Sequence, residues 1–179
     1  MKNLRLLLLC VASASALLIG CSKKTDSTNS SAATTESASG NAATSGAKNA
    51  PASGRAVEIT ANDQMKFSLT EIRAKPGEPL SVTLKNVGSI PKFSMGHNFV
   101  VMKNADVVES FIQEAATAAT SDYIPPSRTS DVVAHTKLLG PKEQDTVTFN
   151  APSQPGRYPF LCSFPGHYQV GMKGDLIVE

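Results

Sequence analysis

The part of the chain from Ala56 to the C terminus is a succession of short stretches rich in Val, Ile, Thr and Phe, separated by Pro, Gly and Asn. Stretches of this kind, alternating or continuously apolar, are typical of strands that pack as a β-sandwich. Pro76-Gly77 and Pro155-Gly156 mark turns between neighbouring stretches. We therefore expect an all-β fold with strands at residues 56–62, 67–74, 79–86, 98–103, 131–136, 145–150, 156–161 and 172–178.

Residues 105–120 depart from this pattern and have helical spacing instead. Their apolar side chains recur at intervals of three and four, at Val108, Phe111, Ile112, Ala115, Ala116 and Ala119. This spacing predicts one helix lying across a flank of the sandwich. The domain of residues 56–179 is long enough to bury a core of its own.

The first twenty residues have the form of a secretory signal peptide. Lys2 and Arg5 precede an apolar run that is too short to span a membrane comfortably. The run ends in Leu18-Ile19-Gly20-Cys21, which resembles the lipobox of bacterial lipoproteins, although a signal with a chance cysteine is the alternative. We expect residues 1–20 to be removed and Cys21 to be acylated, which would anchor the protein without a transmembrane helix. The resemblance to Gram-negative lipoproteins, with Ser22 after the cysteine, implies export to the outer membrane, with the inner membrane as the alternative.

Residues 21–55 read as a spacer between the anchor and the folded domain. From residue 22 to 54 they consist mainly of Ser, Thr, Ala, Asn and Gly, without aromatic residues, Val, Ile or Leu. Such a composition cannot build a core and is typical of a flexible linker. The 17 Lys and Arg of the chain, less two in the signal, balance the 15 Asp and Glu. A chain without a basic surface is a poor candidate for nucleic-acid binding.

Cys162 is the cysteine that needs a chemical explanation. Cys10 leaves with the signal and Cys21 is taken by lipid, so Cys162 is an inert buried thiol, a nucleophile or a metal ligand. Its neighbours favour the third reading, because His167 and Met172 follow within ten residues, between two expected strands. A nucleophilic enzyme would also need an orienting third group and an oxyanion hole, for which the sequence shows no framework.

A thiolate, an imidazole and a thioether together suit copper, whose two oxidation states accept soft sulfur and imidazole ligands. Zinc would be served poorly by a Met ligand. The second imidazole is His97, because Gly96 before it lets the backbone approach a metal closely and so lets the Gly96 carbonyl face the ion opposite Met172. His135 lies in the middle of an expected strand, and we interpret it as a surface or supporting histidine.

Four segments resemble azurin, the blue copper family of cupredoxins: residues 62–67, 95–98, 134–138 and 162–167. The resemblance implies a cupredoxin Greek-key sandwich in which His97, Cys162 and His167 bind one copper ion, with the Gly96 carbonyl and Met172 as weak axial groups. It also implies that the backbone N–H groups of Asn98 and Phe164 donate to the cysteine sulfur.

Three features depart from the azurin pattern. Four residues separate His167 from Met172 where azurins typically have three, and this spacing resembles auracyanin. The mature domain lacks a second cysteine, so the family's disulfide cannot form. Asn86 stands where many azurins keep a histidine near the copper, so their pH-linked potential is not carried over. These departures concern the tuning of the site.

The resemblance also implies a function and a docking surface. Met65, Met95, Pro165 and Gly166 would form, with Phe164, an apolar patch at the edge of His167, although core packing is the commoner use of Met. We expect a monomeric electron carrier, not an enzyme, that exchanges electrons through His167 with c-type cytochromes or periplasmic copper or haem oxidoreductases. A nitrite reductase would need more than the three histidines present, while a copper-storage or defence lipoprotein remains the alternative, although no Met-rich or His-rich tract supports it.

Overall fold

The computed structural model describes residues 54–179. The expected signal peptide, the acylated Cys21 and all but the end of the linker lie outside the described residues. Within residues 54–179, no helix is both long enough and apolar enough to cross a membrane.

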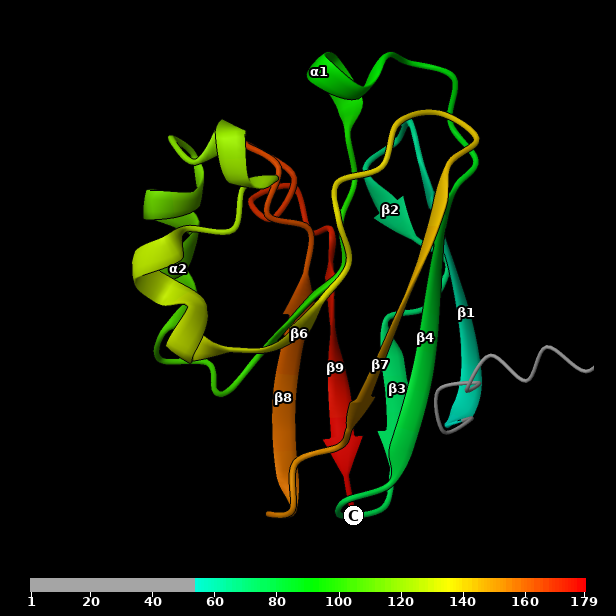
Figure 1. Ribbon diagram of the computed structural model, residues 1–179, viewed down its shortest axis with the longest axis vertical. Coiled ribbons are helices and arrows are strands. Elements are labelled where there is room, and N and C mark those ends of the chain that lie inside the picture. The colour runs from blue at the N-terminus through cyan, green and yellow to red at the C-terminus, as the bar shows by residue number, and fades with distance from the viewer. Residues whose placement is uncertain (1–53) are drawn as a thin grey trace, which may run out of the picture. The chain divides into compact units, whose positions relative to one another are not determined.

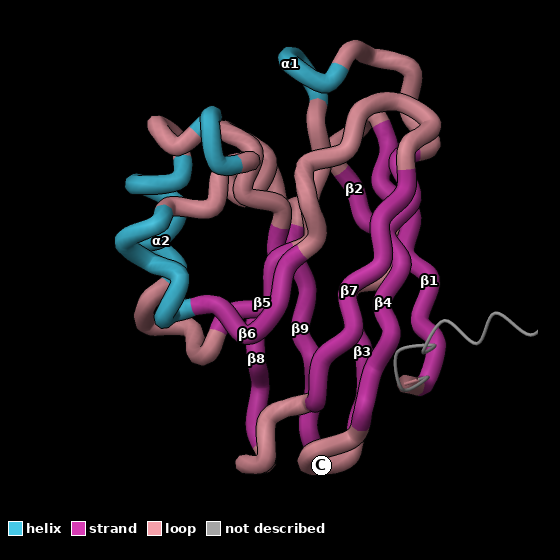
Figure 2. Tube along the Cα trace, in the orientation of Figure 1, coloured by secondary structure: helices cyan, strands magenta, loops and turns pink. Residues whose placement is uncertain are grey.

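The described residues form two β-sheets with helical segments on one flank (Figures 1 and 2). One sheet has the strand order β2-β1-β4-β7 and the other the order β3-β9-β8-β5-β6. The strands are β1 (Arg55–Asn62), β2 (Lys66–Phe67), β3 (Glu71–Ala74), β4 (Pro79–Asn86), β5 (Val100–Met102), β6 (Val132–His135), β7 (Gln144–Asn150), β8 (Gly156–Leu161) and β9 (Lys173–Val178). The helices are α1 (Lys92–Met95) and α2 (Val108–Ala115), with 3-10 turns at η1 (Ala119–Ser121) and η2 (Pro126–Asp131). This arrangement confirms the all-β sandwich with a flanking helix.

The core lies between the two sheets. Strand β4 shows why: Leu80, Val82 and Leu84 are fully buried, while the residues between them are partly exposed. Full burial of one such side chain stabilises the fold by about 2–3 kcal/mol. On the facing side, Phe160 packs against Phe99 with ring centroids 5.1 Å apart. The alternation seen in the sequence therefore reflects which face of each strand meets the other sheet.

The prediction of one strand at residues 67–74 is wrong, because the chain changes sheets within it. Phe67 pairs with Ala61 of β1 in the first sheet, whereas Glu71 pairs with Asp175 of β9 in the second. The break falls at residues 68–70, where Leu69 is 39% exposed. The strand predicted at 98–103 is likewise shorter, since β5 spans Val100–Met102. Local sequence pattern does not show which sheet a strand joins.

The predicted helix at 105–120 is correct in position and wrong in length. Its buried side chains Val108, Phe111, Ile112 and Ala115 lie on the predicted face, but regular α-helix ends at Ala115. These side chains pack against the outer face of β5 and β8, forming a second apolar cluster with Val100 and Leu161. In Figure 1 the helix lies on the side of that sheet facing away from β1 and β4.

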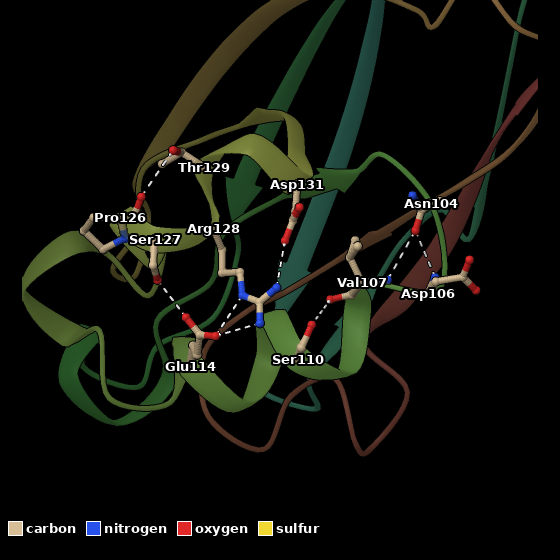
Figure 3. Close-up of polar contacts among 10 residues, drawn as sticks. All are labelled: Asn104, Asp106, Val107, Ser110, Glu114, Pro126, Ser127, Arg128, Thr129 and Asp131. Atoms are coloured by element: carbon tan, nitrogen blue, oxygen red, sulfur yellow. Dashed lines mark hydrogen bonds and ion pairs between the residues drawn. The ribbon is translucent and has the colours of Figure 1, made fainter.

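The segment after α2 is tied to it by polar contacts (Figure 3). Arg128 of η2 donates to Glu114 of α2 at 2.8 Å and to Asp131 at 3.3 Å, and Ser127 donates to Glu114 at 2.7 Å. At the other end of the helix, the Asn104 side chain accepts from two backbone N–H groups. These contacts are exposed or partly exposed to solvent, so each contributes little to the stability of the domain.

Candidate metal centre

Two histidines and one cysteine meet at one end of the sandwich. His97 lies between α1 and β5, Cys162 directly after β8, and His167 in the loop between β8 and β9. Their possible ligand atoms all lie within 4.8 Å of one another, and all three residues are buried. The Cys162 Sγ is 3.3 Å from His167 Nδ1, and the two imidazole centroids are 4.9 Å apart. The structure thus brings together the three residues that the sequence suggested as principal ligands.

The backbone around His97 is fixed by hydrogen bonds to the segment at Leu139 and by close packing at Gly96. His97 exchanges two backbone hydrogen bonds with Leu139, at 3.1 and 2.8 Å. Gly96 allows α1 to fold back against this segment, since a Cβ at Gly96 would lie 2.7 Å from the Lys92 carbonyl and 2.9 Å from the Leu138 side chain. The short helix α1 was not predicted from the sequence, because four residues after a proline carry no clear periodicity.

The loop from Cys162 to Met172 folds its donor side chains inward. The His167 N–H donates to the Phe164 carbonyl at 3.1 Å, and the Met172 N–H donates to the His167 carbonyl at 3.0 Å. Gly166 has a φ of 86°, a left-handed conformation that suits glycine in so tight a turn. Met172 is fully buried, and Gly96 is also buried. The assignment of either residue as an axial ligand stays a prediction.

Burial favours the uncharged forms of the three donor side chains. It raises the pKa of the Cys162 thiol to about 12, against the effect of hydrogen bonds from the Asn98 and Phe164 N–H groups. Burial lowers the pKa of His97 to about 4, and burial together with nearby His97 lowers the pKa of His167 to about 4. Neutral imidazoles are ready to bind a cation, whereas the thiol must lose its proton to do so.

The donor set fits a copper ion on evidence internal to the fold. Both ring nitrogens of His97 are buried without a well-formed hydrogen bond, a costly arrangement unless another group occupies them. A single thiol and two imidazoles around that position match the ligand types of an electron-transfer copper site. His135 lies outside this group, on β6, with an exposed side chain and its Nδ1 3.0 Å from the Thr136 carbonyl.

The sequence did not reveal the role of the Asn98 side chain. Its amide donates to the Ser163 hydroxyl at 2.8 Å and to the Asp122 carbonyl at 2.9 Å. Its oxygen accepts from the Ser163 N–H at 2.8 Å. Asn98 therefore joins the strand that follows His97 to the loop that begins at Cys162. A polar residue between a ligand and the apolar run 99–102 was the signal that could have suggested this.

Aromatic rings continue the packing from the ligand loop toward the surface. Phe164 lies against the His167 imidazole with centroids 4.7 Å apart, and Tyr123 contacts the edge of Phe164 at 5.0 Å. Asn86, which the sequence analysis noted as a departure from the azurin pattern, is buried and donates to the Leu139 carbonyl at 3.3 Å. It therefore supports the segment that pairs with His97 without adding a titratable group.

The residues proposed as a docking patch differ in exposure. Pro165 and Gly166 are exposed, whereas Met65 and Met95 are partly buried, and Met65 packs against the core. Phe93 in α1, which the sequence analysis did not single out, is 82% exposed.

Comparisons with known proteins agree with the fold and the donor set. A family model described as copper binding proteins of the plastocyanin/azurin family matches residues 54–179. Azurin of Pseudomonas chlororaphis is 39% identical over 126 residues, covering 69% of this chain and 97% of that protein. Outer membrane protein H.8 of Neisseria gonorrhoeae is 40% identical over 114 residues, covering 63% of this chain and 61% of that protein. Auracyanin from Roseiflexus castenholzii has a TM-score of 0.64 at 36% identity, covering 71% of this chain and 98% of that chain. The chain therefore belongs to the plastocyanin/azurin family of copper-binding electron carriers.

Proposed function

We propose that the protein is a membrane-anchored one-electron carrier with a blue copper site. His97, Cys162 and His167 would be the principal ligands, and the Gly96 carbonyl and Met172 the weak axial groups. The observation that carries the proposal is the buried cluster of one thiol and two imidazoles, in which both His97 nitrogens lack a well-formed hydrogen bond. A copper ion held there would supply a one-electron Cu(I)/Cu(II) couple.

The chain's own contribution is a dry and preorganised cage. All three principal donors are at most 2% exposed, so water has little access to them. Asn98 and the backbone bonds of the ligand loop hold the donors in place through contacts within the chain itself. The N–H groups of Asn98 and Phe164 direct positive dipoles at the sulfur and so favour its thiolate form.

The docking surface that we propose is centred on Pro165 and Gly166 and extends to Met65, Met95 and Phe93. Pro165 and Gly166, in the loop between β8 and β9, and Phe93, in α1 shortly before His97, are exposed. A small apolar surface suits a transient complex that must separate quickly after electron transfer. The partners proposed are c-type cytochromes or periplasmic copper or haem oxidoreductases, met by a monomeric carrier.

The proposed location is the outer membrane, reached by export and acylation at Cys21. The signal-like residues 1–20 and the cysteine that follows them support export and anchoring. The similarity to proteins named outer membrane protein H.8 in Neisseria supports the choice of membrane. Replacing Cys21 by Ser should release the protein from the membrane fraction, and retention there would contradict the anchor.

The electron-carrier proposal is tested by loading the purified full chain with Cu(II) and recording its visible spectrum beside Cys162→Ser. We expect an intense blue thiolate-to-copper band that ascorbate bleaches and that the substitution abolishes. His135→Ala is the matched control, because this exposed histidine lies outside the donor cluster and its loss should leave the band unchanged. A colourless wild-type protein would refute the proposal.

A further inference from the structure

The loop between His167 and Met172 is held by its own backbone hydrogen bonds and also reaches the surface. The N–H of Val170 donates to Gly166 at 3.3 Å, and the N–H of Gly171 donates to Tyr168 at 3.0 Å. Val170 is nevertheless 49% exposed, and Gly171 has a φ of 89°. The four residues between His167 and Met172 are one more than the typical azurin spacing, and they lead directly into Met172.

A lysine from another part of the chain holds this exposed part. The Lys66 ammonium donates to the Val170 carbonyl at 3.0 Å, across 104 residues of sequence. A Cβ built on Gly171 would lie 3.5 Å from the same ammonium, so Lys66 borders two consecutive residues of the loop. Within residues 54–179 the Lys66 ammonium makes no ion pair, and the polar group that it contacts is the Val170 carbonyl.

The backbone that presents Lys66 is itself well fixed. The Asn62 side chain accepts hydrogen bonds from the N–H groups of Gln64 and Lys66, at 3.1 and 3.3 Å. Met65 adopts a φ of 55° in this turn, and its N–H donates to the Asn62 carbonyl at 3.0 Å. Three hydrogen bonds to Asn62 therefore hold the turn that carries Lys66, whose side chain reaches the ligand loop.

We propose that Lys66 is a positioning residue that fixes the segment between His167 and Met172 and thereby sets the position of the Met172 thioether. This inference rests on the proposed copper site and adds a determinant of its geometry. The physical reason is that a longer segment between two ligands has more conformations available, and a cation hydrogen-bonded to the Val170 carbonyl removes some of them. Lys173 assists at the other side, where its ammonium lies 4.4 Å from the centroid of the Tyr168 ring.

The test compares the wild-type full chain with Lys66→Met, which keeps the apolar stem and removes the donor, and with Lys66→Arg, which keeps a cationic donor. Lys103→Met is the matched control, since Lys103 is an exposed lysine beyond the opposite end of β5 from His97. In the copper-loaded proteins, we expect Lys66→Met to shift both the ratio of the two thiolate-to-copper absorption bands and the reduction potential. Lys66→Arg should restore both, and Lys103→Met should change neither.

A second readout does not depend on copper. In the metal-free chain, amide hydrogen exchange at Gly171 and Met172 should accelerate about 5-fold in Lys66→Met, the factor that corresponds to loss of one hydrogen bond. Unchanged exchange together with an unchanged band ratio would overturn the inference. A shifted potential with an unchanged band ratio would overturn it as well, because Lys66 would then act only through its charge. A wild-type chain without the blue band would instead overturn the proposed function, and the inference with it.

Discussion

Replacing Asn98 by Ala should destabilise the domain more than any exposed polar substitution of similar size. The side chain is fully buried and makes three hydrogen bonds, two to Ser163 and one to the Asp122 carbonyl. Each bond contributes about 1 kcal/mol, and removing one partner leaves the other buried without compensation. The expected loss in the free energy of unfolding is therefore about 3 kcal/mol, a large share of the stability of a small domain.

The assay is urea unfolding of the metal-free chain, so that copper binding does not add to the measured stability. With an m-value of about 1.5–2 kcal/mol/M, the midpoint should fall by about 1.5–2 M at unchanged m. Thr83→Val is the matched control, because the Thr83 hydroxyl makes a single 2.8 Å contact with Thr146 near the surface, and its loss should cost about 0.5 kcal/mol or less. A loss below about 1 kcal/mol for Asn98→Ala would refute the view that this side chain joins the two halves of the site.

Three further changes test other parts of the structure. The metal-free chain should lose stability as pH falls from about 6.5 to 4. In this range the unfolded state protonates its histidines, whereas His97 and His167 of the folded state stay neutral because their pKa values are lowered to about 4. A urea midpoint that does not change over this range would contradict the burial argument. Gly96→Ala should lower the free energy of unfolding by at least about 2 kcal/mol and weaken copper binding, since the new Cβ meets backbone of α1. In the control Gly77→Ala the new Cβ meets no atom, so the loss should be only about 1 kcal/mol, caused by the φ of 72°. Phe111→Ala should cost about 3–4 kcal/mol by opening a cavity under α2, yet leave the blue band in place when copper is added to the folded protein.

How far the sequence predicted the structure depends on the range of the interactions involved. The ligand loop was predictable because Cys162, His167 and Met172 lie within one short segment and their chemistry is informative together. Strands such as β4 were predictable because burial alternates along them. These are local patterns, and each can be read without knowledge of the rest of the fold.

The parts that could not be predicted depend on distant partners. The chain changes sheets between β2 and β3 because β2 pairs with β1 and β3 pairs with β9, and these two partners lie near opposite ends of the domain's sequence. The side-chain role of Asn98 depends on Ser163, 65 residues away. The contact of Lys66 with the ligand loop spans 104 residues, so no local pattern could show it.

The register between β5 and β8 explains why the donors meet at all. Val100 pairs with Leu161 and Val101 with Phe160, which places Cys162 on the same face as Phe160, toward the core between the sheets. A slip of one residue would turn Cys162 to the opposite face, where Val100 and Leu161 pack under α2. Because both faces are covered by apolar side chains, such a slip would expose or misplace buried groups on each side. The flanking helix supplies no ligand, yet by packing against this outer face it helps to fix the register on which the metal centre depends.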